Sequence, residues 1–429
     1  MGFVLLISFF VLVGFGIPIG YTLGLVSVGG ALLFWDPAYL LVLARKMVSG
    51  VDSFTIMAMP LFMLGGAIMN KSGITDGLVE FSKTMVGHIR GGLGHVTIVA
   101  SILFAGLTGV AMADVAALGS ILIPAMERDG YTKAFAAAVT SAASVIGPII
   151  PPSLVMIIYA HVMGESVAAL FLGGIIPGLV MGLCLMLYMG YIAKKRGYKK
   201  FGERPTPKKF AKSFLSSMPA LGAPLIILGG IIMGICTPTE AAALVVLYAF
   251  LLGYFVYRTV KIKDLPNMLL SSTVVTSIVF LIIGTASQLG FLITDVHLPV
   301  KISQGLLYVT HNKYIMLIFI NLFLLLMGMI LEIIPNVVLL SPILAPLAVN
   351  LGIHPIHFAL ILLVNLNIGM NTPPMGGLLF ITSAIAREKF ENVLKETWPF
   401  MGMQIISLII ITYIPETVLW IPRMFGFIQ

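Results

Sequence analysis

Charged residues are scarce in this chain of 429 residues, because Asp, Glu, Lys and Arg together make up only 10% of it. About a quarter of the residues of an average soluble domain are charged. Hydrophobic residues make up 59% of the chain. This composition excludes an ordinary soluble enzyme, a nucleic-acid-binding protein and a disordered chain. Since ~20 apolar residues form one membrane span, it predicts a single all-α polytopic membrane protein.

Cysteine is almost absent. Cys184 and Cys236 both lie inside apolar stretches, so we interpret them as small buried hydrophobic residues and not as a disulfide or metal pair. No Lys or Arg precedes Arg45, whereas a signal peptide has a basic region before its apolar core. The first apolar segment is therefore expected to remain as a membrane anchor.

The positive charge is unevenly distributed. Nine of the 25 basic residues fall between Lys194 and Lys212. A short loop this basic is typical of the cytoplasmic side of a membrane protein. A phospholipid- or RNA-binding patch is the less favoured alternative.

The basic loop separates two sets of apolar segments. They cover residues 3–34, 54–70, 93–126, 133–163, 169–193, 215–235, 239–257, 266–293, 313–350, 356–386 and 397–421. Basic residues at Arg128, Arg258 and Arg387 agree with the orientation that the loop assigns. With this orientation, segment 356–386 runs opposite to segment 133–163.

Two apolar segments are interrupted near their middle. Segment 93–126 breaks at Gly106 to Gly109, and segment 313–350 breaks at Glu332 to Asn336. The two arms of the first segment are each too short to cross ~30 Å of hydrocarbon at ~1.5 Å per residue. We therefore expect two re-entrant helical hairpins that enter the membrane from opposite faces.

A broken helix follows each hairpin. The breaks run from Gly147 to Ser153 and from Gly369 to Gly376, and each contains adjacent prolines, which cannot continue a helix. From Gly109 to Pro151 is 42 positions, and from Glu332 to Pro373 is 41. Hairpin plus broken helix thus occurs twice, at matching spacing and in opposite orientation. This pattern indicates the inverted-topology repeats of a secondary transporter, whose sites lie near the membrane midplane.

The residues resemble the large membrane subunit (DctM-like, M subunit) of tripartite ATP-independent periplasmic (TRAP) transporters over nearly the whole chain. The resemblance depends on Gly234 to Ala242, Pro148 to Ser153, Thr372 to Pro374, and Ala113 with Asp114. It implies an elevator-type transporter of the bacterial inner membrane that is driven by sodium. It also implies two partners, namely a small four-helix membrane subunit (Q-type) and a periplasmic substrate-binding protein.

The domain prediction follows the two repeats. Residues 93–168 and 313–390 are expected to form the transport domain. The scaffold is expected to comprise residues 1–92 and 169–312, the latter including the basic loop 194–212, and residues 391–429 to form a C-terminal helix.

Sodium is a hard cation that prefers oxygen ligands, and broken membrane helices supply backbone carbonyl groups. Two pseudo-symmetric sodium sites are therefore predicted, and the resemblance implies that sodium is the coupling ion, with no other cofactor expected. The candidate residues are Thr108, Gly109, Asp114, Gly147, Pro148 and Pro152 in the first half, and Glu332, Gly369, Met370 and Thr372 in the second. By resemblance, Asp114 matches the aspartate of a family sodium site. The alternatives are that Asp114 satisfies backbone donors at a helix N-terminus and that Glu332 only closes its hairpin.

The candidate substrate-binding residues are Ser153, Asn336, Asn365, Asn367 and Thr372. Hydroxyl side chains in membrane helices often bond only to their own backbone, which is the alternative for Ser153. An organic anion can also be held by helix N-termini, and no clear intramembrane Arg is present. The sequence departs from many relatives at Val110, Glu332 and Asn336, and these changes affect the choice of substrate. Glu240, which follows Pro238, is expected to cap a helix.

The predicted function is sodium-coupled uptake of an organic anion, such as a sugar acid, a sialic acid, a keto acid or a C4-dicarboxylate. The alternative is a sodium/dicarboxylate-type elevator symporter that works without a binding protein. An enzyme is not expected, because the chain has no H-E-x-x-H, G-x-S-x-G or P-loop motif. Paired inverted breaks also suit alternating access better than a passive channel. The expected surroundings are the lipid bilayer, and no nucleic acid is involved.

Overall fold

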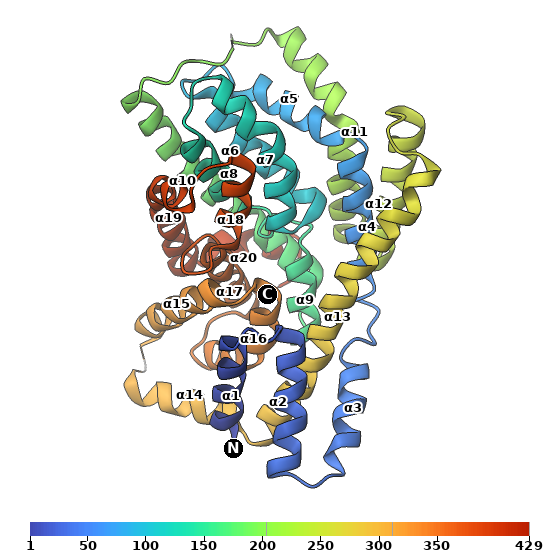
Figure 1. Ribbon diagram of the computed structural model, residues 1–429, viewed down its shortest axis with the longest axis vertical. Coiled ribbons are helices and arrows are strands. Elements are labelled where there is room, and N and C mark those ends of the chain that lie inside the picture. The colour runs from blue at the N-terminus through green and yellow to red at the C-terminus, as the bar shows by residue number, and fades with distance from the viewer. Residues whose placement is uncertain (203, 311, 429) are drawn as a thin grey trace.

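The structure, a computed structural model, describes residues 1–202, 204–310 and 312–428, with the side chains of residues 107, 108, 303, 306, 307 and 309 outside that description. Within these ranges every regular element is a helix, apart from an isolated bridge between Arg90 and Lys200. The all-α prediction is confirmed, and Figure 1 shows the helices in chain order.

The helices of the first half are α1 (Gly2–Gly14), α2 (Ile19–Phe34), α3 (Tyr39–Ser49), α4 (Ala58–Lys71), α5 (Ile74–Val86), α6 (Gly92–Thr108), α7 (Ala111–Arg128), α8 (Lys133–Ser144), α9 (Leu154–Met163) and α10 (Val167–Lys195). Those of the second half are α11 (Pro207–Ile232), α12 (Pro238–Leu251), α13 (Leu265–Asp295), α14 (Leu298–Val309), α15 (Lys313–Ile330), α16 (Ile333–Asn350), α17 (Pro355–Met370), α18 (Gly377–Ala386), α19 (Phe390–Tyr413) and α20 (Glu416–Met424). A π-helical turn at Leu252–Val256 extends α12, and a 3-10 turn at Ile262–Asp264 precedes α13.

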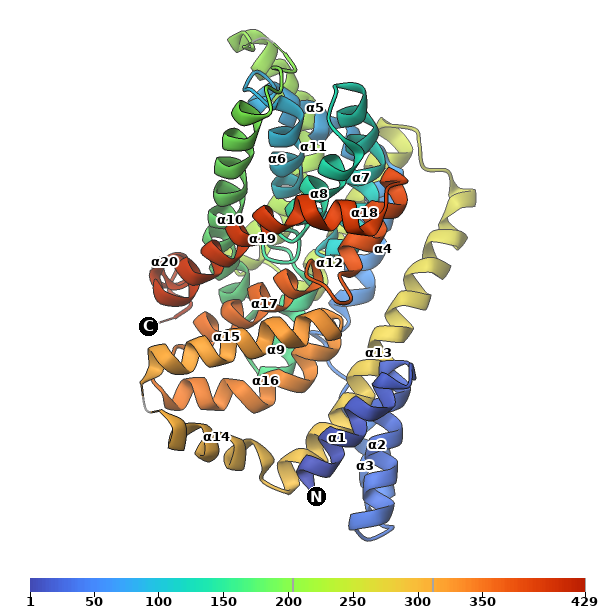
Figure 2. The same cartoon turned by 60° about the vertical axis from the view of Figure 1, so that its left-hand side comes forward.

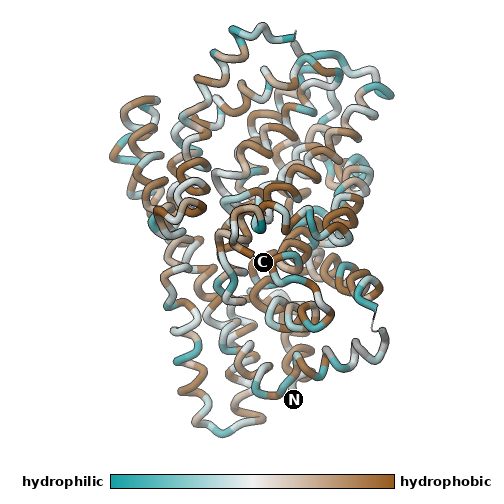
Figure 3. The backbone as a smooth tube through the Cα atoms, turned by 180° about the vertical axis from the view of Figure 1, so that it is seen from behind, coloured by the Kyte–Doolittle hydropathy of each residue, from teal (hydrophilic) through white to brown (hydrophobic). Residues whose placement is uncertain are grey.

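Six helices of the described ranges are long and apolar enough to cross a membrane, and a seventh span results if α19 and α20, bent by 56° at their junction, count as one. Hydrophobic residues line most of the helices, and hydrophilic residues gather in the loops toward the ends of the long axis (Figure 3). The polytopic prediction is therefore confirmed.

The predicted hairpins and broken helices are present. Hairpin arms α6, α7, α15 and α16 are 17 or 18 residues long, about 26 to 27 Å at 1.5 Å per residue, which is close to the ~30 Å hydrocarbon core of a bilayer; α15 and α16 are two of the six long apolar helices counted above. Helix α6 begins 41 positions before α8, and α15 begins 42 positions before α17. The first hairpin lies in the upper half of Figure 1 and the second in the lower half.

Three helices, α3, α5 and α14, lie outside the apolar segments read from the sequence. In α5, the charged residues Asp76, Glu80 and Lys83 recur every three or four positions and interrupt the apolar run. A search for long apolar segments therefore misses amphipathic helices. Helix α5 precedes the first hairpin and α14 the second, so both belong to the repeat, and they lie near opposite ends of the molecule (Figure 2).

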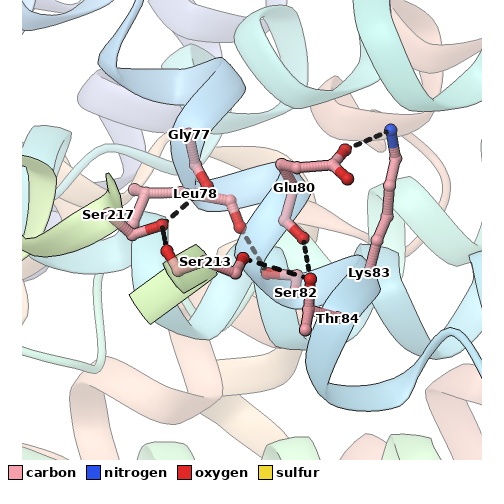
Figure 4. Close-up of polar contacts among 8 residues, drawn as sticks. All are labelled: Gly77, Leu78, Glu80, Ser82, Lys83, Thr84, Ser213 and Ser217. Carbon is pink, nitrogen blue, oxygen red and sulfur yellow. Dashed lines mark hydrogen bonds and ion pairs between the residues drawn. The ribbon is translucent and has the colours of Figure 1, made fainter. Parts of the chain in front are cut away.

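Polar contacts fasten α5 to α11 (Figure 4). The Ser217 hydroxyl donates to the carbonyl of Gly77 at 3.0 Å, and the Thr84 hydroxyl donates to the hydroxyl oxygen of Ser213 at 3.1 Å. On the exposed face, Lys83 pairs with Glu80 at 3.1 Å within α5. The amphipathic helix thus contacts α11 through the Thr84 hydroxyl and the Gly77 carbonyl, and it keeps the Lys83–Glu80 pair on its exposed face.

The second arm of each hairpin packs against both broken helices. Arm α7 contacts α8 of its own repeat and α18 of the other, and arm α16 contacts α17 and α9. The two repeats are therefore interlocked around the two breaks, where α17 is buried along nearly its whole length.

Candidate functional site

The tip of the first hairpin rests on the first break. Gly109 lies between α6 and α7 with φ +61°, a left-handed conformation that favours glycine. A Cβ atom on Gly109 would lie 2.8 Å from the carbonyl oxygen of Pro152 and 2.9 Å from the nitrogen of Leu154. The backbone of the hairpin tip therefore packs directly against the backbone of the break, and a side chain at position 109 would push the two apart.

The carboxylate of Asp114 reaches the same break. Asp114 lies in the first turn of α7 and is fully buried. A Cβ atom on Gly147 would lie 2.0 Å from its Oδ2 atom, so the carboxylate packs directly on the Gly147 backbone. The structure thus brings Asp114 to Gly147 and Gly109 to Pro152. The side chain of Thr108 lies outside the described part of the chain.

Ser153 supports the break from within. Its hydroxyl donates to the carbonyl of Pro148 at 2.6 Å and accepts from the nitrogen of Met156 at 3.4 Å, which makes Ser153 the N-cap of α9. The single hydroxyl proton of Ser153 is therefore used inside the break. Pro151–Pro152 is a cis peptide, as is Pro373–Pro374 in the second break.

The second hairpin meets the second break through a pair of glycines. A Cβ atom on Gly369, near the end of α17, would lie 2.6 Å from the Cα of Gly328, near the end of α15. The nitrogen of Met375 also donates to the carbonyl of Met329 at 3.3 Å. This close approach in the second repeat corresponds to the contact of Gly109 with Pro152 in the first.

Asn336 and Glu332 behave differently at the second tip. The Asn336 amide donates to the carbonyls of Met327 and Leu331 at 3.1 and 3.0 Å, and it thereby closes the hairpin. The Glu332 side chain is exposed and makes no hydrogen bond within the described ranges, although Glu332 is the N-cap residue of α16. The two residues are close in sequence, but only Asn336 is held in place.

The three asparagines predicted to bind substrate share one property. Asn336, Asn365 and Asn367 are fully buried, and in the described part of the chain their Oδ1 atoms accept no hydrogen bond. Asn365 donates to Asn321 on α15 at 2.9 Å, whereas Asn367 donates to the carbonyl of Leu363 at 2.8 Å. Asn365 and Asn367 lie about 200° apart around α17, so they serve different faces of that helix.

The remaining candidates lie beside the second break. The Thr372 hydroxyl donates to the carbonyl of Ile368 at 2.9 Å, and Met370 is buried at the end of α17. As at Ser153, the hydroxyl proton is used by the local backbone. Backbone carbonyl groups are therefore the main oxygen atoms that this break presents.

Sequence reasoning missed a buried network that joins the two repeats. The Ser141 hydroxyl on α8 donates to Oδ1 of Asn371 in the second break, at 2.5 Å. The Asn371 amide donates to Gln404 on α19 at 3.4 Å, and Gln404 donates back to the carbonyl of Ala142 at 3.0 Å. All three side chains are fully buried. Their polarity within apolar segments was the available signal, but Ser141 and Asn371 are 230 positions apart.

Comparison with known proteins identifies the family. Residues 6–417 match the model of the tripartite ATP-independent periplasmic transporter, DctM component. The chain belongs to this family.

Two relatives of the DctM family illustrate the range of substrates. The sialic acid TRAP transporter large permease protein SiaM of Vibrio cholerae is 37% identical over 96% of this chain and 96% of its own. The C4-dicarboxylate TRAP transporter large permease protein DctM of Pseudomonas aeruginosa is 37% identical over 93% of this chain and 94% of its own. Both are permeases, so this DctM-family chain is a transporter component and not an enzyme.

The fold of the DctM-family chain also has a counterpart among solved structures. The crystal structure of the Alcanivorax borkumensis YdaH transporter, described as having an unusual topology, superposes with a TM-score of 0.62 at 15% identity, covering 88% of this chain and 89% of that one. The likeness concerns the fold alone. Together with the spans described above, the family places the chain in the bacterial inner membrane as an integral protein.

Proposed function

We propose that this DctM-family chain is the large permease subunit of a sodium-coupled importer of an organic anion. The observation that carries the proposal is the buried carboxylate of Asp114, held against the backbone of a helix break where a hairpin tip also rests. A buried carboxylate in a membrane protein is costly, with insertion scales giving about 2.5–3.5 kcal/mol at the centre of a span. A bound cation offsets that cost.

The chemistry of the breaks suits sodium. Hard cations are bound by carboxylate, carbonyl and amide oxygens, and the first break offers Asp114 with the carbonyls around Gly147, Pro148 and Pro152. The second break offers carbonyls around Gly369, Met370 and Thr372, and the buried Oδ1 of Asn336 lies in the adjoining hairpin. Glu332 belongs to this second set only if its exposed side chain turns inward.

The packing supports an elevator mechanism. Helices α8, α9, α17 and α18 and both hairpins interlock around the breaks, and α10 and α19 pack onto them. On the other side, α13 packs against α2, α3 and α4, and α12 packs against α4 and α11. We assign the first group to a transport body and the second to a scaffold. This moves α10, placed in the scaffold by sequence reasoning, into the transport body together with α19.

Helix α10 supports that reassignment through close contacts. A Cβ atom on Gly174 would lie 2.3 Å from the carbonyl oxygen of Ile149, and one on Gly178 would lie 2.2 Å from Ile150. Small residues let membrane helices approach this closely. Because α10 is packed so tightly against the first break, the two are expected to move together.

The substrate is proposed to be a carboxylic acid that binds between the tips. The names of the two relatives specify sialic acid and C4-dicarboxylates, which are both organic acids. The N-termini of α9 and α18 begin at the breaks and can hold an anion without a buried Arg. The proposed substrate contacts remain Ser153, Asn336, Asn365, Asn367 and Thr372. The amide oxygens of the three asparagines can accept hydrogen bonds from hydroxyl groups of a sugar acid.

The proposed partners follow from the tripartite family. A small membrane subunit and a periplasmic binding protein are expected to complete the transporter. Uptake by the large and small subunits without the binding protein would instead support the stand-alone symporter.

The test is uptake into proteoliposomes that contain both membrane subunits, with the binding protein loaded with a radiolabelled acid. An inward sodium gradient is expected to drive accumulation, and Asp114→Asn is expected to weaken its sodium dependence while expression stays normal. Removing the charge lowers the affinity for a cation but leaves a side chain of the same size. Uptake that stays undiminished without a sodium gradient would exclude the coupling, and unchanged sodium dependence in Asp114→Asn would remove that residue from the site.

A further inference from the structure

A basic pocket of about 510 Å³ lies where the end of α10 meets the start of α6. Four cationic residues line it, namely Arg90 before α6, and Lys194, Lys199 and Lys200 at and after the end of α10. The other lining residues include Tyr198 and no acid. The positive-inside rule assigns this side of the membrane to the cytoplasm.

The backbone around the pocket is fixed by hydrogen bonds. Gly197 ends α10 with φ +69°, and the nitrogen of Tyr198 donates to the carbonyl of Ala193 at 3.0 Å, as in a Schellman cap. The nitrogen of Gly91 donates to the carbonyl of Lys199 at 3.0 Å, and that of Phe201 donates to the carbonyl of Gly87 at 3.1 Å. The loop therefore presents its cations from a defined position, unlike a free basic tail.

The charge of the pocket is not balanced within the described ranges. None of its four cations forms an ion pair there, whereas Arg196 of the same loop pairs with Glu396 at 2.7 Å. Asp129 lies near Lys199: burial raises the pKa of its carboxyl group, and the charge of Lys199 opposes that rise. Because four cations and no acid line the pocket, it favours an anion with more than one negative charge.

An apolar stripe leads along α10 to the pocket. Leu179, Leu183, Leu187 and Tyr191 are spaced four apart, and each is exposed, with fractions from 49% to 62%. Lys194 lies seven positions after Leu187 and therefore on nearly the same face of the helix. A soluble anion gains nothing from this stripe, whereas the acyl chains of a lipid can cover it.

We propose that this pocket binds the phosphate headgroup of an anionic phospholipid, with its acyl chains along the stripe of α10. Basic pockets at the cytoplasmic edge of membrane helices suit such headgroups. Four cations match the two phosphates of a cardiolipin headgroup better than the single phosphate of phosphatidylglycerol. Because the pocket joins α6 and α10, a bound lipid would tie the first hairpin to the helix that packs on its break.

The basic loop also offers a contrasting site. Lys209 and Lys212 line a different cavity, which contains Glu80, so an acid of the chain is already present there. The positive-inside rule explains the presence of all these cations on one side of the membrane. It does not explain why four of them face one cavity without an acid in its lining.

The experiment measures binding of tetraoleoyl cardiolipin to the purified full chain by native mass spectrometry. The test variant is Arg90→Gln/Lys194→Gln/Lys200→Gln, which retains Lys199 because Asp129 lies near it. The matched control, Lys208→Gln/Lys209→Gln/Lys212→Gln, removes the same number of positive charges from the basic loop 194–212 but spares the pocket. Each cation near an anionic surface contributes roughly fivefold to binding, so the test variant should lose on the order of a hundredfold in affinity and the control far less.

Three outcomes would overturn the proposal. An equal loss of cardiolipin affinity in both variants would mean that the basic loop attracts lipid diffusely. Binding of phosphatidylethanolamine as tight as that of cardiolipin would mean that the charge of the headgroup is irrelevant. Displacement of cardiolipin by excess inorganic phosphate would assign the pocket to a free anion. Lysine acetylation of the unaltered protein gives a second measurement that needs no variant. Cardiolipin should protect Lys194 and Lys200 and leave Lys208 reactive, and equal reactivity of all three would also reject the site. Because lipid binding is measured without transport, its failure leaves the proposed function unaffected.

Discussion

At the scale of single residues, glycine determines how close the two hairpins come to the two breaks. The carboxylate of Asp114 packs against the backbone of Gly147, and the carbonyl oxygen of Pro152 packs against the backbone of Gly109. In the second repeat, the backbone of Gly328 packs directly against the backbone of Gly369, and no carboxylate takes part in that contact. The first break thus combines a carboxylate with a close backbone contact, and the second relies on backbone groups and amides, so the two proposed sodium sites are expected to differ in affinity.

Gly147→Ala tests the contact with Asp114. A methyl group there would lie 2.0 Å from Oδ2, and since overpacking costs about 1–3 kcal/mol, either the carboxylate or the break must move. We expect the sodium concentration for half-maximal uptake to rise by roughly tenfold or more, about 1.4 kcal/mol of lost binding. Gly402→Ala on α19 is the control, because a Cβ atom there meets nothing within 4 Å. Unchanged sodium dependence in Gly147→Ala would contradict the assignment.

At the scale of helices, a buried polar network links α8, the second break and α19, and its directional hydrogen bonds fix positions that apolar packing alone does not fix. Asn371 in the second break bonds to Ser141 on α8 and to Gln404 on α19, and Gln404 bonds back to α8. The second break is therefore tied to the first half of the other broken helix. A displacement of one break is expected to displace the other, so sodium binding at one proposed site would affect sodium binding at the other.

A double-mutant cycle on Asn371→Ala and Gln404→Ala measures this network. The single change at Asn371 leaves the Ser141 hydroxyl and the Oε1 atom of Gln404 without the partner they have in the network, which costs roughly 1–3 kcal/mol. Since both single changes break the same network, the double variant should be more stable than additivity predicts, by about 0.5 kcal/mol or more in thermal unfolding. Asn267, an exposed residue of α13, provides the control, and Asn371→Ala with Asn267→Ala should be additive. Additivity in both cycles would mean that the network carries no coupling.

The helix breaks and the cap of α12 were predictable from the sequence, whereas two amphipathic helices and the polar network were not. Pro148, Pro151 and Pro373 cannot continue a helix, so the breaks and the repeat were predictable from local chemistry. Glu240 was also predictable: it forms a capping box with Thr237 at the start of α12. Helices α5 and α14 were missed because their polar residues divide the apolar pattern. The pairing of Asn371 with Ser141 depends on tertiary packing across 230 positions, and no local pattern indicates it.

At the scale of the whole molecule, the proposed transport body and scaffold meet in more than one place: α6 packs against α5 and α11 near the basic loop, and α16 packs against α13 on the side opposite that loop. There the ring of His161 on α9 lies 3.1 Å from the carbonyl oxygen of Gly50, just after α3. A cavity of about 400 Å³ separates the two bodies nearby and is lined by Lys46, Ser49, Val162 and Ser287, among others. In an elevator these surfaces slide past each other, so the contact of His161 with Gly50 has to break in each cycle.

Cross-linking across this cavity tests the division into two bodies. In a background with Cys184→Ala and Cys236→Ala, a cleavable bis-maleimide should join Ser49→Cys on α3 to Val162→Cys on α9 and stop uptake, because the transport body can no longer move past the scaffold. Ser49→Cys with Ser287→Cys is the matched control. It uses the same cavity and the same first cysteine, but α3 and α13 both belong to the scaffold. That pair should keep uptake when cross-linked, and cleaving the linker should restore uptake in the first pair. Full uptake by the cross-linked first pair would show that α9 does not move relative to α3, and the elevator assignment would then be wrong.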